Sequence, residues 1–298
     1  MTENYENLAT RVQAINRQIA DIQRDGIVIE SRQQSFEFHL GGDYKFLLTV
    51  LGLNAANSNF SCVFCLAPKT GRHLKSHKRR QTIRIRDPGV VRPNLLPAVP
   101  LDHVVIDTLH MHLRVTDKLF ACVFDKIKYE KRDHFVSVVY KHVKTQGKLK
   151  AERDKIETSS LSATDRDKII DVLISTDVLQ VSCESQELGQ QLKEIVTQYS
   201  VLRESMRTAS HRSDIDESCS IFLEKFLAVF QTKMVTPYIH MMCVHVPELI
   251  ERFGTLSAFC QQADEKLNHE VAAGYLRCSN FTDGARQVLQ RQWRKTQY

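Results

Sequence analysis

The sequence of 298 residues predicts an α+β fold that is mostly helical. Three observations lead to this prediction. Alternation of apolar and polar residues is confined to a short segment near the N-terminus, helical periodicity recurs after residue 100, and a proline-rich stretch separates the two. This order fits a small sheet interrupted by a large helical insertion.

The first elements are a helix and a strand. Apolar side chains recur with helical spacing over residues 5–24, and a short apolar run covers residues 27–29. Phe36, Phe38 and Leu40 alternate with polar residues, which predicts a half-buried strand.

Asp43 follows that strand directly, after Gly41-Gly42. Residues 44–53 are apolar and either continue the strand or form a short second element, whereas residues 54–61 are a polar turn. Residues 69–100 are basic and then proline-rich, which excludes long regular structure there.

The remaining chain is predicted to be helical apart from an exposed loop over residues 146–165. Val246-Pro247 marks a helix boundary, and Gly254 is a stop signal. The expected helices cover residues 101–127, 164–175, 184–208, 216–252 and 263–277.

Composition excludes several classes of protein. No run approaches 18 apolar residues, so no membrane span is expected, and the polar N-terminus lacks the apolar core of a signal peptide. An intracellular protein is therefore expected, in which the 8 cysteines are reduced and either buried or bound to metal. The net charge of +6 permits an anionic partner without requiring one.

Cys62-x-x-Cys65 has the spacing of a zinc knuckle, although such a pair alone is a weak signal. Two histidine pairs compete to complete the site. His73 and His77 are near in sequence, but the loop between Cys65 and His73 is well short of the about 12 residues that are usual in a zinc finger. His240 and His245 lie five residues apart, which on a regular helix turns them about 140° away from each other, so they need a bend. Spacing alone favours neither pair.

Two acids have positions that suit phosphoryl transfer. Asp43 stands at a predicted strand end, and Glu265 begins a predicted helix. Carboxylates placed in this way can share divalent metal ions, which clamp the attacking and leaving oxygens of a phosphodiester.

The C-terminal segment from His240 to Glu265 resembles the catalytic segment of the V(D)J recombinase catalytic subunit and the Transib transposases. The likeness extends to the order of Asp43, the cysteine pair, the ID-x-LH block at residues 106–110, the histidine pair and Glu265. The separations of Asp43 from Cys62 and of His245 from Glu265 also match that family.

The resemblance implies an RNase H-like core that cleaves DNA and joins the freed strand to another. It implies that Asp43 and Glu265 are catalytic and bind Mg²⁺ or Mn²⁺. It also implies a structural zinc ion, and thereby favours the downstream histidine pair, with the ligands Cys62, Cys65, His240 and His245.

Three segments follow from the resemblance: a partial RNase H-like core over 1–66, a basic loop and helical insertion over 67–232, and C-terminal helices over 233–298. The family needs a further aspartate upstream of Asp43, and none is found on a strand there, so we expect a core that lacks its start. The alternative is a catalytically inactive, domesticated module that contains zinc and binds DNA or a protein.

The basic run over residues 72–86 predicts either contact with DNA phosphates, a nuclear-import signal or a solvated loop. The resemblance favours DNA as a partner, a nuclear location and a homodimer, since transposition pairs two DNA ends. The candidate DNA-binding residues are Lys75, Lys78, Arg79, Arg80, Arg84 and Arg86.

Several other features are interpreted as structural. Asp107 is expected to cap or pack the helix that follows it, and Met241-Met242 and the stripe of Phe222, Phe226 and Phe230 are expected in the core.

Overall fold

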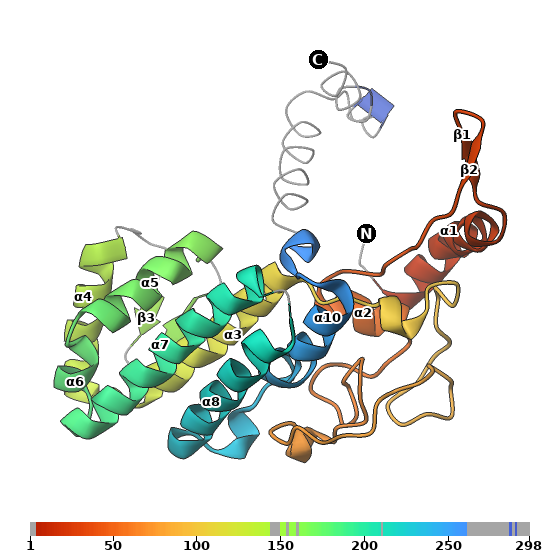
Figure 1. Cartoon of the computed structure of the whole chain (residues 1–298). Coiled ribbons are helices and arrows are strands. Elements are labelled where there is room, and N and C mark those ends of the chain that lie inside the picture. The colour runs from red at the N-terminus through yellow and green to blue at the C-terminus, as the bar shows by residue number, and fades with distance from the viewer. Residues whose placement is uncertain are drawn as a thin grey trace. The chain divides into compact units, whose positions relative to one another are not determined.

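The computed structural model describes residues 4–143, 150–152, 155–158, 161–209, 211–260, 286–287 and 290. The chain divides into two compact units, Met1–Phe259 and Cys260–Tyr298. The first unit holds helices α1 to α10 and two short hairpins (Figure 1). The prediction of a mostly helical α+β protein is confirmed at this level.

The predicted first helix is confirmed as α1, Tyr5–Asp25. The side chain of Asn4 caps it by accepting a hydrogen bond from the Asn7 N–H, and Gly26 ends it with a φ of 66°. The short apolar run that follows is strand β1, Ile27–Ile29, which pairs antiparallel with β2, Arg32–Gln34.

The strand predicted around Phe36–Leu40 is wrong except at its last residue. Residues 35–39 are irregular, and only Leu40 is buried and bridged, in parallel with Val104. The alternation does not mark a strand here, because Phe36 is 37% exposed and no strand among the described residues pairs with residues 35–39. The apolar segment that follows does form a second element, helix α2, Tyr44–Val50, with Asp43 as its N-cap.

The basic and proline-rich region holds no long regular structure, as expected. Its helical segments are the short 3₁₀ turns η1, Lys69–Gly71, and, just after it, η2, Leu101–His103. Gly52 joins this region to α2 with a φ of 69°, and its carbonyl accepts hydrogen bonds from the N–H groups of Val91 and Arg92.

The insertion begins with α3, Thr108–Asp125, which starts later than predicted because the Asp107 side chain caps it at Leu109 and His110. The turn η3, Tyr129–Lys131, and helix α4, Arg132–Val143, follow. Part of the expected loop over 146–165 is a hairpin of β3, Lys150–Glu152, and β4, Lys155–Glu157.

Two of the later helices match their predicted ranges closely. They are α5, Ala163–Ser175, and α7, Gln186–Thr208, with α6, Val178–Ser182, between them. The helical stretch expected over 216–252, with a boundary at Val246-Pro247, is divided at further points as well. Its parts are α8 Ser213–Val229, η4 Thr232–Met234, α9 Pro237–His240, the π-helix η5 Met241–His245 and α10 Val246–Phe253.

Gly254 ends α10 with a φ of 77°, as the stop signal predicted, and the turn η6, Ser257–Phe259, follows. The helix expected over 263–277 lies outside the described residues.

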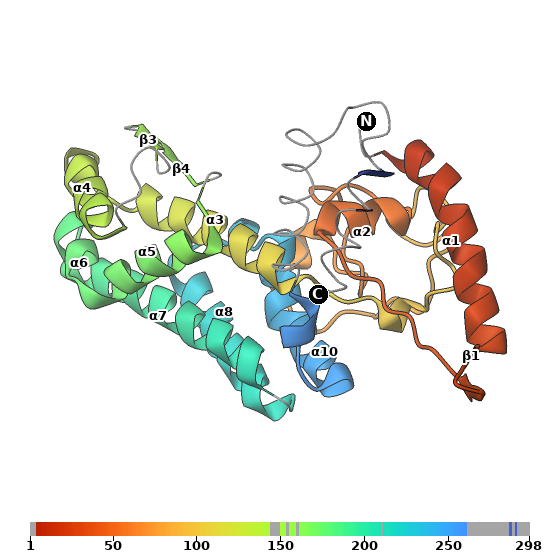
Figure 2. The same cartoon turned by 90° about the horizontal axis from the view of Figure 1, so that it is seen from above.

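One continuous hydrophobic cluster runs from Leu40 to Leu256 and joins the loops after α2 to the helices. Helices α3, α5 and α7 lie side by side, and α7 packs on α8 (Figures 1 and 2). The phenylalanine stripe of α8 and the Met241-Met242 pair are buried in this cluster, as predicted. Within the described residues, no helix has the length and apolar character that a membrane crossing needs.

Candidate metal centre and adjoining cavity

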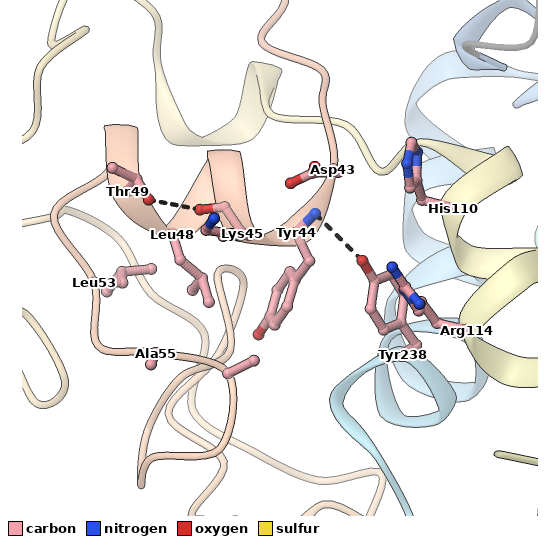
Figure 3. A pocket seen from close by; sticks show the side chains of 11 residues that line it. Asp43, Tyr44, Lys45, Leu48, Thr49, Leu53, Ala55, His110, Arg114 and Tyr238 are labelled. Carbon is pink, nitrogen blue, oxygen red and sulfur yellow. Dashed lines mark hydrogen bonds between the residues drawn. The ribbon is translucent and has the colours of Figure 1, made fainter. Parts of the chain in front are cut away.

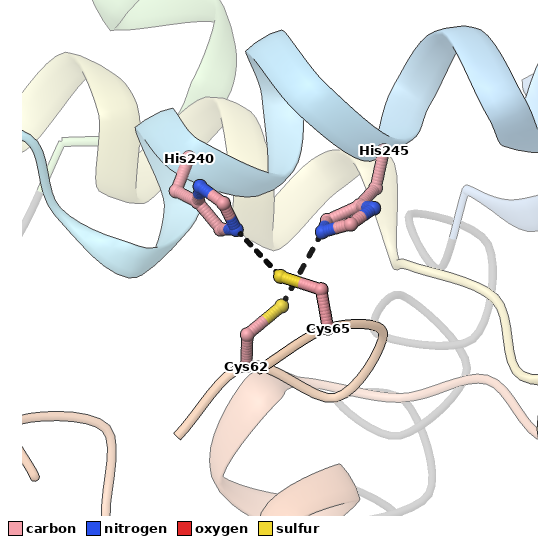
Figure 4. Close-up of side chains that lie close together, drawn as sticks. All are labelled: Cys62, Cys65, His240 and His245. Carbon is pink, nitrogen blue, oxygen red and sulfur yellow. Dashed lines mark hydrogen bonds between the residues drawn. The ribbon is translucent and has the colours of Figure 1, made fainter. Parts of the chain in front are cut away.

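Four side chains from two distant segments meet in the core (Figure 4). Cys62 and Cys65 come from the loop after α2, whereas His240 directly precedes the π-helix η5 and His245 is its last residue. The Cys62 Sγ lies 3.4 Å from His245 Nε2, and the Cys65 Sγ lies 3.3 Å from His240 Nε2. All four are buried, and their ligand atoms lie within 4.8 Å of one another.

This donor set fits a zinc ion. Two thiolates and two imidazoles are a common structural set, and in a tetrahedral site with ordinary bond lengths a sulfur and a nitrogen ligand lie ~3.6 Å apart. The two S···N distances of 3.4 and 3.3 Å are close to that value. The site can therefore bind zinc with only small movements of its side chains.

The π-helix explains how residues five apart reach one centre. A π-helix bonds each N–H to the carbonyl five residues back, so His240 and His245 lie on the same side. Pro247 favours this geometry because it has no N–H to continue the ladder. The Met242 carbonyl, five residues before Pro247, therefore receives no hydrogen bond from residue 247. It accepts a hydrogen bond from the Cys219 thiol at 3.4 Å instead.

Both histidine rings are oriented by a second hydrogen bond. His240 Nδ1 donates to the Arg72 carbonyl, and His245 Nδ1 donates to the Glu248 carboxylate, each at 2.8 Å. Glu248 is paired in turn with Arg79 at 2.5 Å. Both contacts need a proton on Nδ1, so Nε2 is the nitrogen that faces the thiols and is available to a metal ion, as in metal-binding histidines.

The charges of the cluster also favour a cation. Burial raises the pKa of the Cys62 thiol, but contact with Cys65 and the charge of His245 outweigh it, so the pKa lies well below its ordinary value. Hydrogen bonding to Cys62, together with burial, raises the pKa of Cys65. Burial lowers the pKa of His245, but the Cys62 thiolate brings it up to about 9. A divalent ion would let both thiols ionise and both rings stay neutral.

The competition between histidine pairs ends in favour of His240 and His245. His77 is not in the cluster: its Nε2 lies 2.8 Å from the Gly71 carbonyl, and its ring packs against that of His240. The His73 side chain is likewise outside the cluster. Neither histidine of the nearer pair therefore belongs to the cluster.

A cavity of about 570 Å³ lies beside α2, the start of α3 and Tyr238 of α9 (Figure 3). Asp43 lies at its wall and accepts a hydrogen bond from the Phe46 N–H at 2.7 Å. The Tyr44 N–H donates to the Tyr238 hydroxyl at 3.3 Å and joins the two sides. Lys45, His110 and Arg114 also line the cavity, which therefore has one carboxylate and two cationic side chains among its described lining residues.

The sequence-predicted residues are only partly brought together. Asp43 lies at the cavity, whereas Glu265 lies outside the described residues. In the basic segment, Arg80 is only 6% exposed and donates to the carbonyls of Cys62 and Phe60, so it supports the knuckle. Lys75 is paired with Asp216.

The remaining basic candidates differ in exposure. Arg79 is held by Glu248. Lys78, Arg84 and Arg86 are exposed and form no ion pair with a described residue.

Sequence reasoning missed several of these residues. His110 and Arg114 lie one turn apart on α3, a spacing that marks a shared helix face. Glu248 lies three residues after His245, so the helical register was available as a signal for its contact. Tyr238 and Lys45 carried no comparable signal, because only the packing of α9 near α2 defines the cavity.

Comparisons with known proteins give a distant similarity and no family assignment. No protein-family model matches the chain. The chain is 22% identical over 305 residues to the V(D)J recombination-activating protein 1 of Oryctolagus cuniculus, over 85% of this chain and 28% of that protein. The chain thus spans less than a third of the relative's length. This similarity supports a recombinase- or transposase-like relationship.

Proposed function

We propose that the chain is a transposase-derived DNA recombinase core that cleaves and joins DNA strands with the help of divalent metal ions. The relative's name points to recombination, and its alignment extends along most of this chain. The observation that carries the proposal is the cavity whose lining includes both the Asp43 carboxylate and the cationic side chains of Lys45 and Arg114.

The cavity residues suit a phosphodiester. Lys45 and Arg114 offer positive charge to phosphate oxygens. Arg114 is 56% exposed and is paired with Asp117 at 3.2 Å. Asp43 and Glu265 would hold Mg²⁺ or Mn²⁺, which when bound supplies Lewis-acid activation of the phosphodiester and of its attacking oxygen. Asp43 itself is anchored at the start of α2, so its position is set by the backbone.

The zinc centre is proposed to be structural. It would join the Cys62 knuckle to the helices that precede residue 265, and so connect the two parts of the chain that carry the proposed catalytic acids. All four ligands are protein side chains and buried, which leaves no open position for a substrate.

The catalytic test is nicking of supercoiled plasmid with Mg²⁺ or Mn²⁺ by the wild type, Asp43→Asn and Glu265→Gln. Asn caps a helix as well as Asp does, so Asp43→Asn removes the metal-binding charge and keeps α2. The matched control is Glu224→Gln, an exposed acid of α8. We expect nicking by the wild type and the control only. Equal nicking by all four proteins would refute the assignment.

A second candidate function is a DNA-binding module that contains zinc but does not cleave. It is favoured by one observation: Asp43 is the only carboxylate among the described residues that line the cavity, and it already serves as a helix cap. In that case every protein in the assay binds DNA, and none nicks it.

DNA binding is tested through the exposed basic residues. Each phosphate contact that is lost lowers the slope of log K against log salt by about 0.9. Replacing Lys78, Arg84 and Arg86 together by Gln should therefore reduce the slope by up to about 3 and weaken binding uniformly across sequences. An unchanged slope would place the DNA contact elsewhere.

We also infer a nuclear location and a homodimer, on the basis of the basic run and the need to pair two DNA ends. Light scattering of the purified chain with and without DNA tests the dimer. Imaging of a tagged chain with the basic residues replaced tests import.

A further inference from the structure

A second group of metal-binding side chains lies where two separate segments meet at the bridge between Leu40 and Val104. His39 and His103 each immediately precede a bridge residue, and their rings stack with centroids 5.1 Å apart. The Glu37 carboxylate lies 3.0 Å from His103 Nε2 and 3.9 Å from His39 Nε2. Three ligand atoms thus converge within 4.8 Å.

Two imidazoles and one carboxylate form a donor set that binds zinc and related transition metals, and such sites keep open positions for water. Neighbouring nitrogen and oxygen ligands in a tetrahedral zinc site lie ~3.4 Å apart. The two N···O distances, 3.0 and 3.9 Å, fall on either side of that value. The side chains of His39 and His103 are 28% and 21% exposed, so an ion has access from solvent.

The hydrogen bond on the far side of His103 fixes how the ring is protonated. His103 Nδ1 lies 3.2 Å from the Phe38 carbonyl oxygen. A carbonyl only accepts, so Nδ1 carries the proton, and in the neutral ring Nε2 presents its lone pair to Glu37. This is the outer contact that orients metal-binding histidines.

An acceptor nitrogen and a carboxylate oxygen 3.0 Å apart need a cation between them. A second proton on the His103 ring would be enough to join His103 Nε2 to the Glu37 carboxylate, but it would leave His39 out. The His39 nitrogen adds a third ligand atom within 4.8 Å of the other two, which a metal ion can use and a proton shared by one pair cannot. Phe253 packs edge-on against the His39 ring at 5.3 Å and holds it against that of His103.

We propose that Glu37, His39 and His103 form a binding site for a divalent transition-metal ion such as Zn²⁺. The ion clips the segment that leads to Asp43 against the segment that leads to Asp107 and α3, beside their shared bridge. The site is separate from the buried Cys62 cluster, and it does not rest on the proposed function.

The test is a Zn²⁺ titration of the full chain, purified with its first zinc bound, by calorimetry and by metal analysis after gel filtration. The variants are His39→Gln, His103→Gln and Glu37→Gln. His134→Gln is the matched control, an exposed histidine of α4. We expect a second equivalent in the wild type and the control. Each site variant should bind it at least about tenfold more weakly, since even outer-shell changes have that effect.

Folding is checked by circular dichroism and by thermal unfolding in chelator. The replaced side chains are partly exposed, so the metal-free variants should match the metal-free wild type. Zn²⁺ should then raise the melting temperature of the wild type more than that of the variants. A wild type that binds no second equivalent, or variants that bind it as tightly as the wild type, would overturn the proposal. If Glu37, His39 and His103 form only ion pairs, the wild type will bind no second equivalent.

Discussion

Asp43 has two roles that a substitution can separate. Its carboxylate accepts the Phe46 N–H at 2.7 Å as the cap of α2, and it also faces the cavity. We predict that Asp43→Ala lowers the free energy of unfolding by about 1 kcal/mol, whereas Asp43→Asn changes it by a few tenths. Urea unfolding measures both. A loss in Asp43→Asn as large as that in Asp43→Ala would show that the charge, and not the cap, stabilises the helix.

Glu248 is the residue through which the proposed zinc centre is best tested without touching a ligand. It accepts the His245 Nδ1 proton and pairs with Arg79. We predict that Glu248→Gln weakens zinc binding by about 10- to 100-fold. The Glu248 carboxylate orients the His245 ring and makes it more basic, and the variant removes this charge. Competition with a coloured chelator measures this. Glu251→Gln, an exposed change on the same helix, is the control and should bind zinc like the wild type.

The break in the last long helix is the element on which the metal centre depends. Pro247 removes an N–H just after the π-helix, and the π-helix brings His240 and His245 onto one side. We predict that Pro247→Ala weakens zinc binding by about tenfold, because the metal-free segment can then return to α-helix, in which these residues diverge by about 140°. Zinc competition measures it, and unchanged affinity would mean that packing alone maintains the π-helix.

Helices α3 and α5 are joined by a buried ion pair. Arg166 is 2% exposed and donates to Asp117 at 2.6 Å and to the carbonyls of Leu113 and Thr158. Burial raises the pKa of Asp117, but the Thr158 hydroxyl and the Arg166 guanidinium outweigh it, so the pKa lies below its ordinary value of 3.8.

This depressed pKa has a defined effect on stability. Because the folded pKa is below the unfolded one, the pair stabilises the fold above pH 3.8, and the contribution is lost as the pH falls further, through the folded pKa. We predict that Asp117→Asn lowers the free energy of unfolding at pH 7 and that its difference from the wild type shrinks below pH 3.8. Urea unfolding at several pH values checks this, and a constant difference would contradict it.

The same elements show which secondary structure a sequence can reveal. Helical periodicity over several turns located α1, α5 and α7 to within a few residues. Alternation over Phe36–Leu40 did not predict a strand correctly. A pattern of five residues is common in sequences, and such a segment forms a strand only where another strand pairs with it. The π-helix was not predicted either, because it depends on Pro247 together with the neighbours that surround it.

At the scale of the molecule, the proposed zinc centre connects segments 175 residues apart, from Cys65 to His240. Metal that binds only the folded state stabilises it by about 4 kcal/mol when free metal exceeds Kd a thousandfold. We predict that a strong chelator lowers the melting temperature of the wild type by more than that of Cys62→Ser, which already lacks that zinc and can lose only the ion of the second proposed site. Calorimetry measures both, with His103→Gln as the control for the second proposed site.

The division into segments 1–66, 67–232 and 233–298 stays a prediction, as do the catalytic roles of Asp43 and Glu265. The compact unit Met1–Phe259 contains parts of all three segments, because one hydrophobic cluster runs through them.

The sequence by itself determined the chemistry that is available: a cysteine pair at knuckle spacing, two histidine pairs, an acid before an apolar segment, and the helices whose periodicity is local. Only the tertiary structure decided which histidines face the cysteines, that Asp43 shares a cavity with Arg114 and Tyr238, and that Glu37, His39 and His103 converge. The reason is physical. Helix periodicity is set by neighbours within a few residues, whereas these contacts depend on how buried surfaces pack after the chain has closed loops of up to 183 residues, as between Cys62 and His245.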